Sequence, residues 1–340
     1  MRALVCHAYG PVENLKIEDI PTPEPRAGEV LIKVGAAGVS FAAMLGVQGK
    51  HQNKPPLPYV PGNEVAGHVV ALGPGVLNLK PGERVAVAAK GGGFAEYAVV
   101  SAANAVPMPN TMPYAQATNF PTLYPTAYGA LKWKAKLLPG EVLLVHGAGG
   151  GSGLTGIEVG KAMGAIVIAS AGGADKLVAA REAGADHLID YRSEDLRARV
   201  LEITGGRGAD VVYDPVGGTA FDQSLRCIAP EGRIIPMGFA SGTIPQIPAN
   251  ILLVKNVTVI GFYYGYYNGW GGKEAPTAKE AAALVARRAL VAEAQKELMA
   301  WYSEGKLKAT VAATFDLGEW VKAFKLIEER AVVGKAVLVP

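Results

Sequence analysis

The stretch EVLLVHGAGGGSGLTGIEVGKAMGA, residues 141–165, decides the fold of this protein. An apolar run, Val142 to Val145, leads directly into a group of glycines. A segment with helical spacing follows, with Ile157 and Met163 directed inward. A strand, a glycine-rich turn and a helix in this order predict a nucleotide-binding βαβ unit.

The spacing of the glycines predicts that the turn binds phosphate. They recur as GxxGxxG at Gly147, Gly150 and Gly153, instead of the more familiar GxGxxG. Because these positions have no Cβ, the backbone can turn sharply, and a pyrophosphate can approach the main-chain N–H groups of Gly151 and Ser152. The alternative interpretation is a tight glycine turn without a ligand.

The next apolar strand, in AIVIASAGGADK at residues 165–176, bears on the choice between NAD and NADP. The stretch contains no acid before Asp175, which falls too late to bind a ribose 2′-hydroxyl. Ser170, Gly172 and their small neighbours leave room for a phosphate, and Lys176 follows as a cation. One charge-assisted contact contributes roughly 1.5 to 3 kcal/mol, which favours NADPH. A solvated lysine at a helix start is the alternative.

The rest of the chain predicts two domains. Up to about residue 121, short strands such as EVLIKVGAAGV and ERVAVAA are separated by Pro and Gly, which indicates a β-rich domain. From about Tyr124 strands alternate with helices, as a parallel sheet requires. We expect residues 1–123 and 265–340 to form one discontinuous domain, interrupted by a nucleotide-binding domain at 124–264.

Composition and charge exclude several classes of protein. The chain of 340 residues has 33 Lys and Arg against 30 Asp and Glu, a net charge of +3 without any basic tract. No nucleic-acid or membrane partner is therefore expected. Two cysteines, Cys6 and Cys227, exclude a disulfide scaffold. Neither a signal peptide nor an apolar run of membrane-spanning length is present, so a cytoplasmic location is expected.

Several motifs occur in a fixed order along the whole chain. They include PGNEVAGHVVALGPGV at 61–76, PTAYGAL at 125–131, VVYDPVGG at 211–218 and ERAVVGKAVLVP at 329–340. In these motifs the chain resembles the zinc-independent quinone oxidoreductases of the medium-chain dehydrogenase/reductase superfamily. The resemblance implies an α/β fold, with a Rossmann-type NADP-binding domain inserted in a β-rich GroES-like catalytic domain, and a homodimer.

The residues at the zinc positions of the superfamily indicate that no metal is bound. Zinc-dependent relatives carry a Cys where this chain has Ser40, a His where it has Asn63, and a four-Cys lobe that is absent here. A catalytic zinc needs three good protein ligands. The five histidines show no ligand spacing. We therefore expect an enzyme that works without zinc.

The resemblance also implies which residues contact NADPH. It places Thr126 beside the nicotinamide and its ribose, and Lys176 and Tyr191 on the 2′-phosphate. Tyr191 could equally be a surface aromatic, and Lys335 an exposed structural lysine. The expected cofactor contacts are Thr126, Gly150, Gly151, Ser152, Gly153, Ser170, Gly172, Lys176, Tyr191, Met237, Gly238, Phe239, Phe262, Tyr263 and Lys335.

The chain departs from the family pattern where the substrate is expected. Quinone oxidoreductases often read VNFxD, whereas this chain reads VSFAA, with Ser40 for the asparagine and Ala43 for the aspartate. His51 stands in place of a common tyrosine. Ser40 could donate a hydrogen bond and His51 a proton near neutral pH, so both are candidate catalytic residues. The alternative for Ser40 is a small residue at the edge of the core, and the alternative for His51 is an exposed loop histidine.

Hydride transfer from NADPH to a quinone is the expected activity. A reduced quinone is a good anion, so positioning the ring supplies much of the catalysis. Reduction of α,β-unsaturated carbonyl compounds, enones or enoyl thioesters, needs a better proton donor and is the alternative. A second alternative is a non-catalytic NADPH-binding sensor or structural protein. The aromatic stretch GFYYGYYNGWGG, residues 261–272, is a candidate wall of the substrate cleft or a packing surface between subunits or domains.

Overall fold

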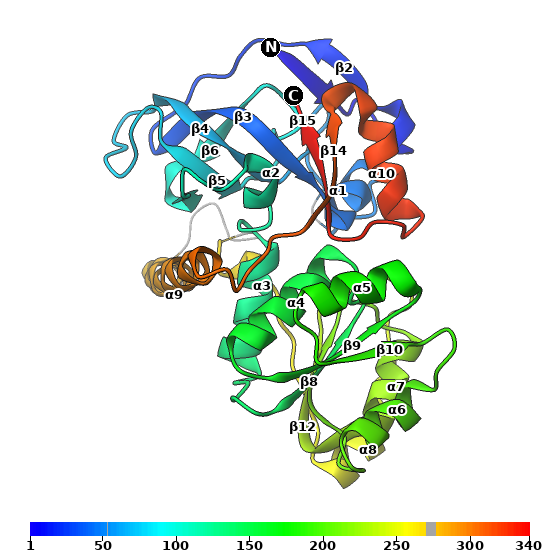
Figure 1. Ribbon diagram of the computed structural model, residues 1–340. Helices are drawn as coiled ribbons and strands as arrows, with labels where there is room; N and C mark the ends of the chain where they lie inside the picture. Colours follow the sequence, from blue (N-terminus) through cyan, green and yellow to red (C-terminus); the bar gives the residue numbers. More distant parts are fainter. Residues whose placement is uncertain (53, 270–276) are drawn as a thin grey trace. The chain divides into compact units, whose positions relative to one another are not determined.

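The computed structural model describes residues 1–52, 54–269 and 277–340 (Figure 1). These residues form two compact units, one of Met1–Thr122 with Ala309–Pro340, the other of Leu123–Lys308. The last three residues of the aromatic stretch, 270–272, lie outside the described residues.

The second unit contains a six-stranded parallel sheet in the order β10-β9-β8-β11-β12-β13. The order reverses beside β8, so ligands are expected at the carboxyl ends of β8 and β11. The central strand β8 is at most 5% exposed from Val142 to Val145, because helices cover both faces of the sheet. The strands are β8 (Val142–His146), β9 (Ile166–Ala171), β10 (His187–Asp190), β11 (Ala209–Asp214), β12 (Ile228–Pro236) and β13 (Thr258–Val259).

Helices lie on both faces of this sheet. Figure 1 shows α4 and α5 along one face and α6, α7 and α8 along the other, the doubly wound arrangement of βαβ units. The helical segments of the unit are α3 (Leu123–Tyr128), the π-helix η3 (Gly129–Lys134), α4 (Gly151–Ala162), α5 (Ala174–Glu182), α6 (Leu196–Ile203), α7 (Thr219–Cys227), α8 (Ala249–Lys255), the 3₁₀ turn η4 (Tyr264–Tyr266) and α9 (Ala278–Ser303).

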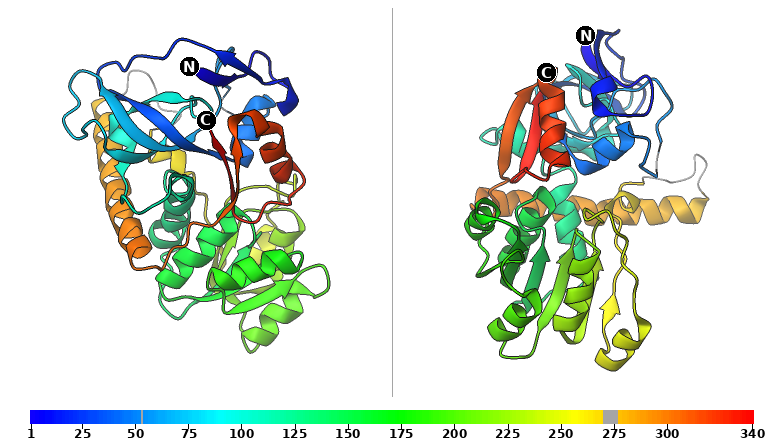
Figure 2. Two further views of the ribbon diagram at one scale, coloured as in Figure 1. Left: turned by 45° about the horizontal axis from the view of Figure 1, so that its top comes forward. Right: turned by 90° about the vertical axis from the view of Figure 1, so that its right-hand side faces the viewer.

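The long helix α9, drawn in orange in Figure 2, belongs to this second unit by its contacts. A capping box starts it, in which Thr277 and Glu280 bond to each other's backbone N–H groups. Near its end, Glu297 accepts hydrogen bonds from Tyr128 and Lys132, and Trp301 packs on the Tyr128 ring. These contacts tie α9 to α3 and η3. Residues 265–269 and 277–308 therefore group with the nucleotide-binding unit, whereas the prediction assigns them to the β-rich domain.

The first unit is β-rich and is built from both parts of the chain. Its main sheet has the order β14-β15-β3-β4-β5-β7, with β6 also paired to β3, and β1 and β2 form a hairpin. The strands are β1 (Arg2–Val5), β2 (Lys16–Asp19), β3 (Glu29–Val39), β4 (Glu64–Leu72), β5 (Arg84–Ala88), β6 (Tyr97–Ser101), β7 (Ala105–Pro107), β14 (Val311–Asp316) and β15 (Lys335–Val339).

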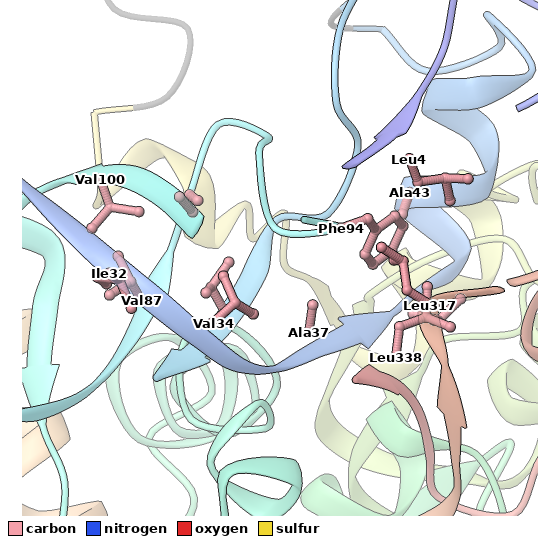
Figure 3. Packing of buried hydrophobic residues seen from close by; sticks show 14 of the residues in the cluster. Leu4, Ile32, Val34, Ala37, Ala43, Val87, Phe94, Val100, Leu317 and Leu338 are labelled. Carbon is pink, nitrogen blue, oxygen red and sulfur yellow. The ribbon is translucent and has the colours of Figure 1, made fainter. Parts of the chain in front are cut away.

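One hydrophobic cluster joins strands from the first part of the chain, residues 1–122, to the C-terminal part, residues 309–340. Ile32 and Val34 of β3 alternate with less buried residues and pack into a cluster that also contains Leu317 and Leu338 (Figure 3). Phe94 packs edge-on against Phe324 of the last helix, with ring centroids 6.0 Å apart. The helical segments of this unit are η1 (Val12–Asn14), α1 (Phe41–Val47), η2 (Ala102–Asn104), α2 (Tyr114–Ala117), η5 (Leu317–Glu319) and α10 (Trp320–Glu328).

Candidate functional site

The glycine turn brings α4 unusually close to β8. Gly147 has φ +59°, in the left-handed region that favours glycine. A Cβ on Gly153 would lie 2.2 Å from the carbonyl oxygen of Gly147, so no larger residue fits there. Gly150 is the N-cap residue of α4, so no side chain accepts a hydrogen bond from the first N–H groups of the helix. The first N–H groups of a helix have no intrahelical partner, so an anion in the turn would meet the amides of Gly151 and Ser152.

The side chain of Ser152 is engaged inside the unit. Its Oγ lies 3.0 Å from the hydroxyl of Tyr213 on β11. Tyr213 is fully buried, and burial raises its pKa to about 12, so this hydroxyl stays protonated. The predicted contact of Ser152 with a phosphate therefore depends on its main-chain N–H.

Buried polar atoms that suit a polar ligand lie beside the turn, at the carboxyl ends of the strands, and we call this end of the sheet the carboxyl edge. Ser170 Oγ on β9 and Asp214 Oδ2 on β11 are buried without a hydrogen-bond partner in the described part of the chain. The other Asp214 oxygen accepts from the N–H groups of Val216 and Gly217, at 2.8 and 3.0 Å. An unsatisfied buried polar atom costs about 1 to 3 kcal/mol. Ligand groups at this edge would offset that cost, so the residues present fit a dinucleotide.

Cationic and aromatic side chains meet at Gly172, directly after β9. A Cβ on Gly172 would lie 2.7 Å from both Arg192 Nε and the Tyr191 hydroxyl. Lys176, half-buried on the first turn of α5, packs against Gly149 of the glycine turn. Lys176 and Tyr191 are among the predicted cofactor contacts, whereas Arg192 is not. Arg192 directly follows Tyr191 in IDYRSED, residues 189–195, so a second cation beside Tyr191 is visible in the sequence.

Five of the expected cofactor contacts follow the last two strands of the sheet, namely Met237, Gly238 and Phe239 after β12, and Phe262 and Tyr263 after β13. Met237 donates its N–H to the carbonyl of Asp214 at 2.7 Å, which places Met237 to Phe239 along the end of β11. Phe262 packs on the Tyr267 ring, with centroids 5.7 Å apart. Phe239 is 41% and Tyr263 44% exposed, so both rings are accessible within this unit. Thr126 lies half-buried on α3.

The remaining predicted cofactor contact, Lys335, forms a buried ion pair. Lys335 is 3% exposed, and its ammonium donates to the carboxylate of Glu64 on β4. The hydroxyl of Thr122 donates to the other carboxylate oxygen at 2.5 Å. The alternative of an exposed lysine is therefore wrong, while a contact between Lys335 and a cofactor stays a prediction.

The two candidate catalytic residues flank α1. Ser40 is the N-cap of this helix, and its Oγ accepts the N–H of Ala43 at 3.2 Å. A capping hydroxyl still has its own proton to donate. His51 is half-buried just beyond the helix, and its backbone N–H bonds to the carbonyl of Leu45 at 3.1 Å. A catalytic role for Ser40 or His51 stays a prediction.

Two further properties concern metals and membranes. Within residues 1–52, 54–269 and 277–340, no three His, Cys, Asp or Glu side chains are grouped so as to hold a metal ion. Within the same ranges, no helix is long and apolar enough to cross a membrane.

Known proteins resemble the chain over its full length. Residues 26–110 match the alcohol dehydrogenase GroES-like domain, and residues 151–284 match the zinc-binding dehydrogenase family. A quinone oxidoreductase-like protein 2 homolog from Nematostella vectensis is 38% identical over 99% of this chain and 88% of its own. The chain therefore belongs to the medium-chain dehydrogenase/reductase superfamily, among its quinone oxidoreductase-like members.

Solved structures agree with this assignment. A quinone oxidoreductase from Escherichia coli, complexed with NADPH, is 30% identical, with a TM-score of 0.87 and complete coverage of both chains. A mycobacterial protein complexed with NADPH is 29% identical, also with a TM-score of 0.87 and complete coverage. The predicted fold class, a Rossmann-type domain inserted in a GroES-like domain, is confirmed.

The buried pair of Lys335 and Glu64 leads to a stability prediction. Lys335→Met should lower the free energy of unfolding by about 3 to 5 kcal/mol, because it leaves a buried carboxylate without its counter-charge. Urea unfolding followed by circular dichroism measures the loss. Lys322→Met is the matched control, since Lys322 pairs with Glu319 in solvent and its loss should leave the midpoint unchanged. Equal midpoints for the two variants would contradict the prediction.

Proposed function

We propose that this protein is a zinc-independent, NADPH-dependent oxidoreductase that transfers a hydride to a quinone. The observation that carries the proposal lies at the carboxyl edge of the parallel sheet, where Lys176 packs against Gly149 of the glycine turn, and Arg192 and Tyr191 lie against Gly172 at the end of β9. NADPH in the Escherichia coli and mycobacterial structures supports the choice of cofactor. Two buried free cysteines, Cys6 and Cys227, suit a reducing cytoplasm.

The residues of the chain would bind and orient the cofactor. Bound NADPH supplies the hydride. The amides of Gly151 and Ser152, at the positive end of α4, bind the pyrophosphate, and Lys176 and Arg192 neutralise the 2′-phosphate. The ring of Tyr263, which is 44% exposed, would be available to contact the nicotinamide.

Ser40 and His51 would serve the acceptor. The Oγ of Ser40 accepts the N–H of Ala43, so the orientation of the hydroxyl is held while its proton remains available to a substrate oxygen. His51 supplies a proton to the reduced ring. Zinc-dependent relatives have Cys and His at the positions of Ser40 and Asn63, which supports chemistry without zinc.

Turnover on a panel of acceptors tests the reaction. We expect rapid oxidation of NADPH with quinones, measured by the loss of nicotinamide absorbance, and no loss of rate after treatment with a metal chelator. Turnover only on enones or enoyl thioesters would establish the double-bond reductase instead. Tight binding of NADPH without turnover on any acceptor would favour the sensor or structural protein.

The choice of NADPH over NADH gives a second prediction. Lys176→Ala and Arg192→Ala should each reduce kcat/KM for NADPH about ten- to a hundredfold, because each removes one charge-assisted contact to the 2′-phosphate. The kcat/KM for NADH should hardly change. Arg181→Ala, at the opposite end of α5, is the control and should leave both values unchanged. Equal losses with the two cofactors would contradict the assignment.

We also propose that the protein is a homodimer. In the described part of the chain, β13 is an edge strand paired with β12, and α8 has no buried residue. Leu253 is 78% and Val254 77% exposed. An open strand edge can pair with its own copy about a twofold axis, which would also cover apolar surface. Light scattering should give twice the chain mass of 35.3 kDa, and a single chain mass would refute the dimer.

A further inference from the structure

We propose that Glu158 is a positioning residue that ties both connections between the two units to the cofactor-binding helix α4. The chain passes from one unit to the other twice, after Thr122 and after Lys308. We call these the first and the second chain crossing. The anchoring itself does not depend on the activity, whereas its effect on turnover depends on the proposed function.

One carboxylate oxygen binds a residue at each chain crossing. The hydroxyl of Tyr124, two positions after the first crossing, donates to Glu158 Oε2 at 2.5 Å. The backbone N–H of Lys308, the last residue before the second crossing, donates to the same oxygen at 3.0 Å. The two donors are far apart in the sequence, so Glu158 is a common anchor for the beginning and the end of the second unit.

The anchor lies in a dry environment. Glu158 is 1% exposed and Tyr124 is fully buried. A buried carboxyl group is tolerated only where hydrogen-bond partners satisfy it, and those hydrogen bonds gain strength where water is excluded. The neighbours of Glu158 on α4, Ile157 and Val159, are buried apolar residues. A carboxyl group among these apolar residues therefore indicates that its hydrogen bonds to Tyr124 and Lys308 have a structural purpose.

Helix α4 connects the anchor to the glycine turn. It begins at Gly151, whose amide we assign to the pyrophosphate, and Glu158 lies about two turns further on, roughly 10 Å along the axis. Helix α3, which contains Tyr124, packs directly against α4. The proposed phosphate site and the anchor of both chain crossings thus belong to one rigid element.

The second chain crossing is held by further contacts. The ammonium of Lys308 donates to the carbonyl of Glu182 at the end of α5, the helix whose first turn contains Lys176. The next residue, Ala309, is 1% exposed with φ +50°. Alanine disfavours this left-handed conformation, so the path of the chain is imposed by its surroundings. The contacts from the proposed cofactor helices α4 and α5 are made to the preceding residue, Lys308.

These contacts suggest how Glu158 acts on the reaction. Hydride transfer requires two reacting atoms to be held within a narrow range of distance and angle. The anchor joins the helix that we assign to the pyrophosphate to α3, which contains Thr126, the residue expected beside the nicotinamide. Loss of the anchor should lower the rate of the chemical step and leave cofactor affinity largely unchanged.

Amide hydrogen exchange of the protein without cofactor tests the anchoring. Glu158→Met should speed exchange of the Lys308 N–H about tenfold or more, together with amides in residues 120–126, because the shared acceptor is lost. Glu158→Gln keeps an oxygen acceptor and should remain close to the wild type. Tyr124→Phe removes the first donor only and should speed exchange at residues 120–126 without unfolding the protein.

Tyr128→Phe is the matched control. It removes another hydroxyl-to-carboxylate hydrogen bond from the same helix, but the partner, Glu297, lies on α9 and not at a chain crossing. This variant should leave exchange of the Lys308 N–H unchanged. Unchanged exchange at Lys308 in Glu158→Met would overturn the proposal, as would an equal increase in Tyr128→Phe.

Kinetics with a quinone acceptor test the positioning. Glu158→Met should lower kcat about tenfold while the Kd for NADPH stays within about twofold, and Glu158→Gln should restore kcat. A merely structural role would lower the melting temperature and leave kcat of the folded protein unchanged, which would overturn the positioning role. If the wild type turns over no acceptor, the proposed function fails, and the exchange at Lys308 still decides the anchoring.

Discussion

The close contact between the backbones of Gly147 and Gly153 determines the geometry of the nucleotide-binding unit. Gly153 has no Cβ, and a Cβ there would lie only 2.2 Å from the carbonyl oxygen of Gly147. Because this space stays free, α4 can begin close to the end of β8. The parallel topology then brings the residues after β9, β10 and β11 to the same edge of the sheet. Ser170, Arg192 and Asp214 lie at the carboxyl edge in this way, at or just after the ends of β9, β10 and β11, although they are distant in the sequence.

Local patterns allowed most of the fold to be predicted, and long-range pairs explain the rest. Apolar strands alternating with helices indicate a parallel sheet, and the glycine spacing fixes the strand-to-helix turn. The boundary at residue 265 differs from the observed division, because α9 is attached by side-chain pairs such as Tyr128 with Glu297, 169 residues apart. A helical pattern shows that α9 forms but not which unit it packs against.

The candidate site divides in the same way. The glycine turn, Lys176 and Tyr191 could be named from the sequence, whereas the place of Arg192 depends on how the chain turns after β10. Ser40 caps the short helix α1 by accepting the N–H of Ala43, a local hydrogen bond that is not among the predictions. The pairing of Lys335 with Glu64 joins residues 271 positions apart and has no local signal.

The pairing of β15 with β3 has a consequence for synthesis on the ribosome. Val39 and Gly38 of β3 pair with Ala336 and Val337, which are translated last, whereas all residues of the second unit precede residue 309. The nucleotide-binding unit can therefore complete its sheet while the β-rich unit still lacks two strands. Domains generally fold as units during translation, so the first-made part of this chain should be the last to reach its native state.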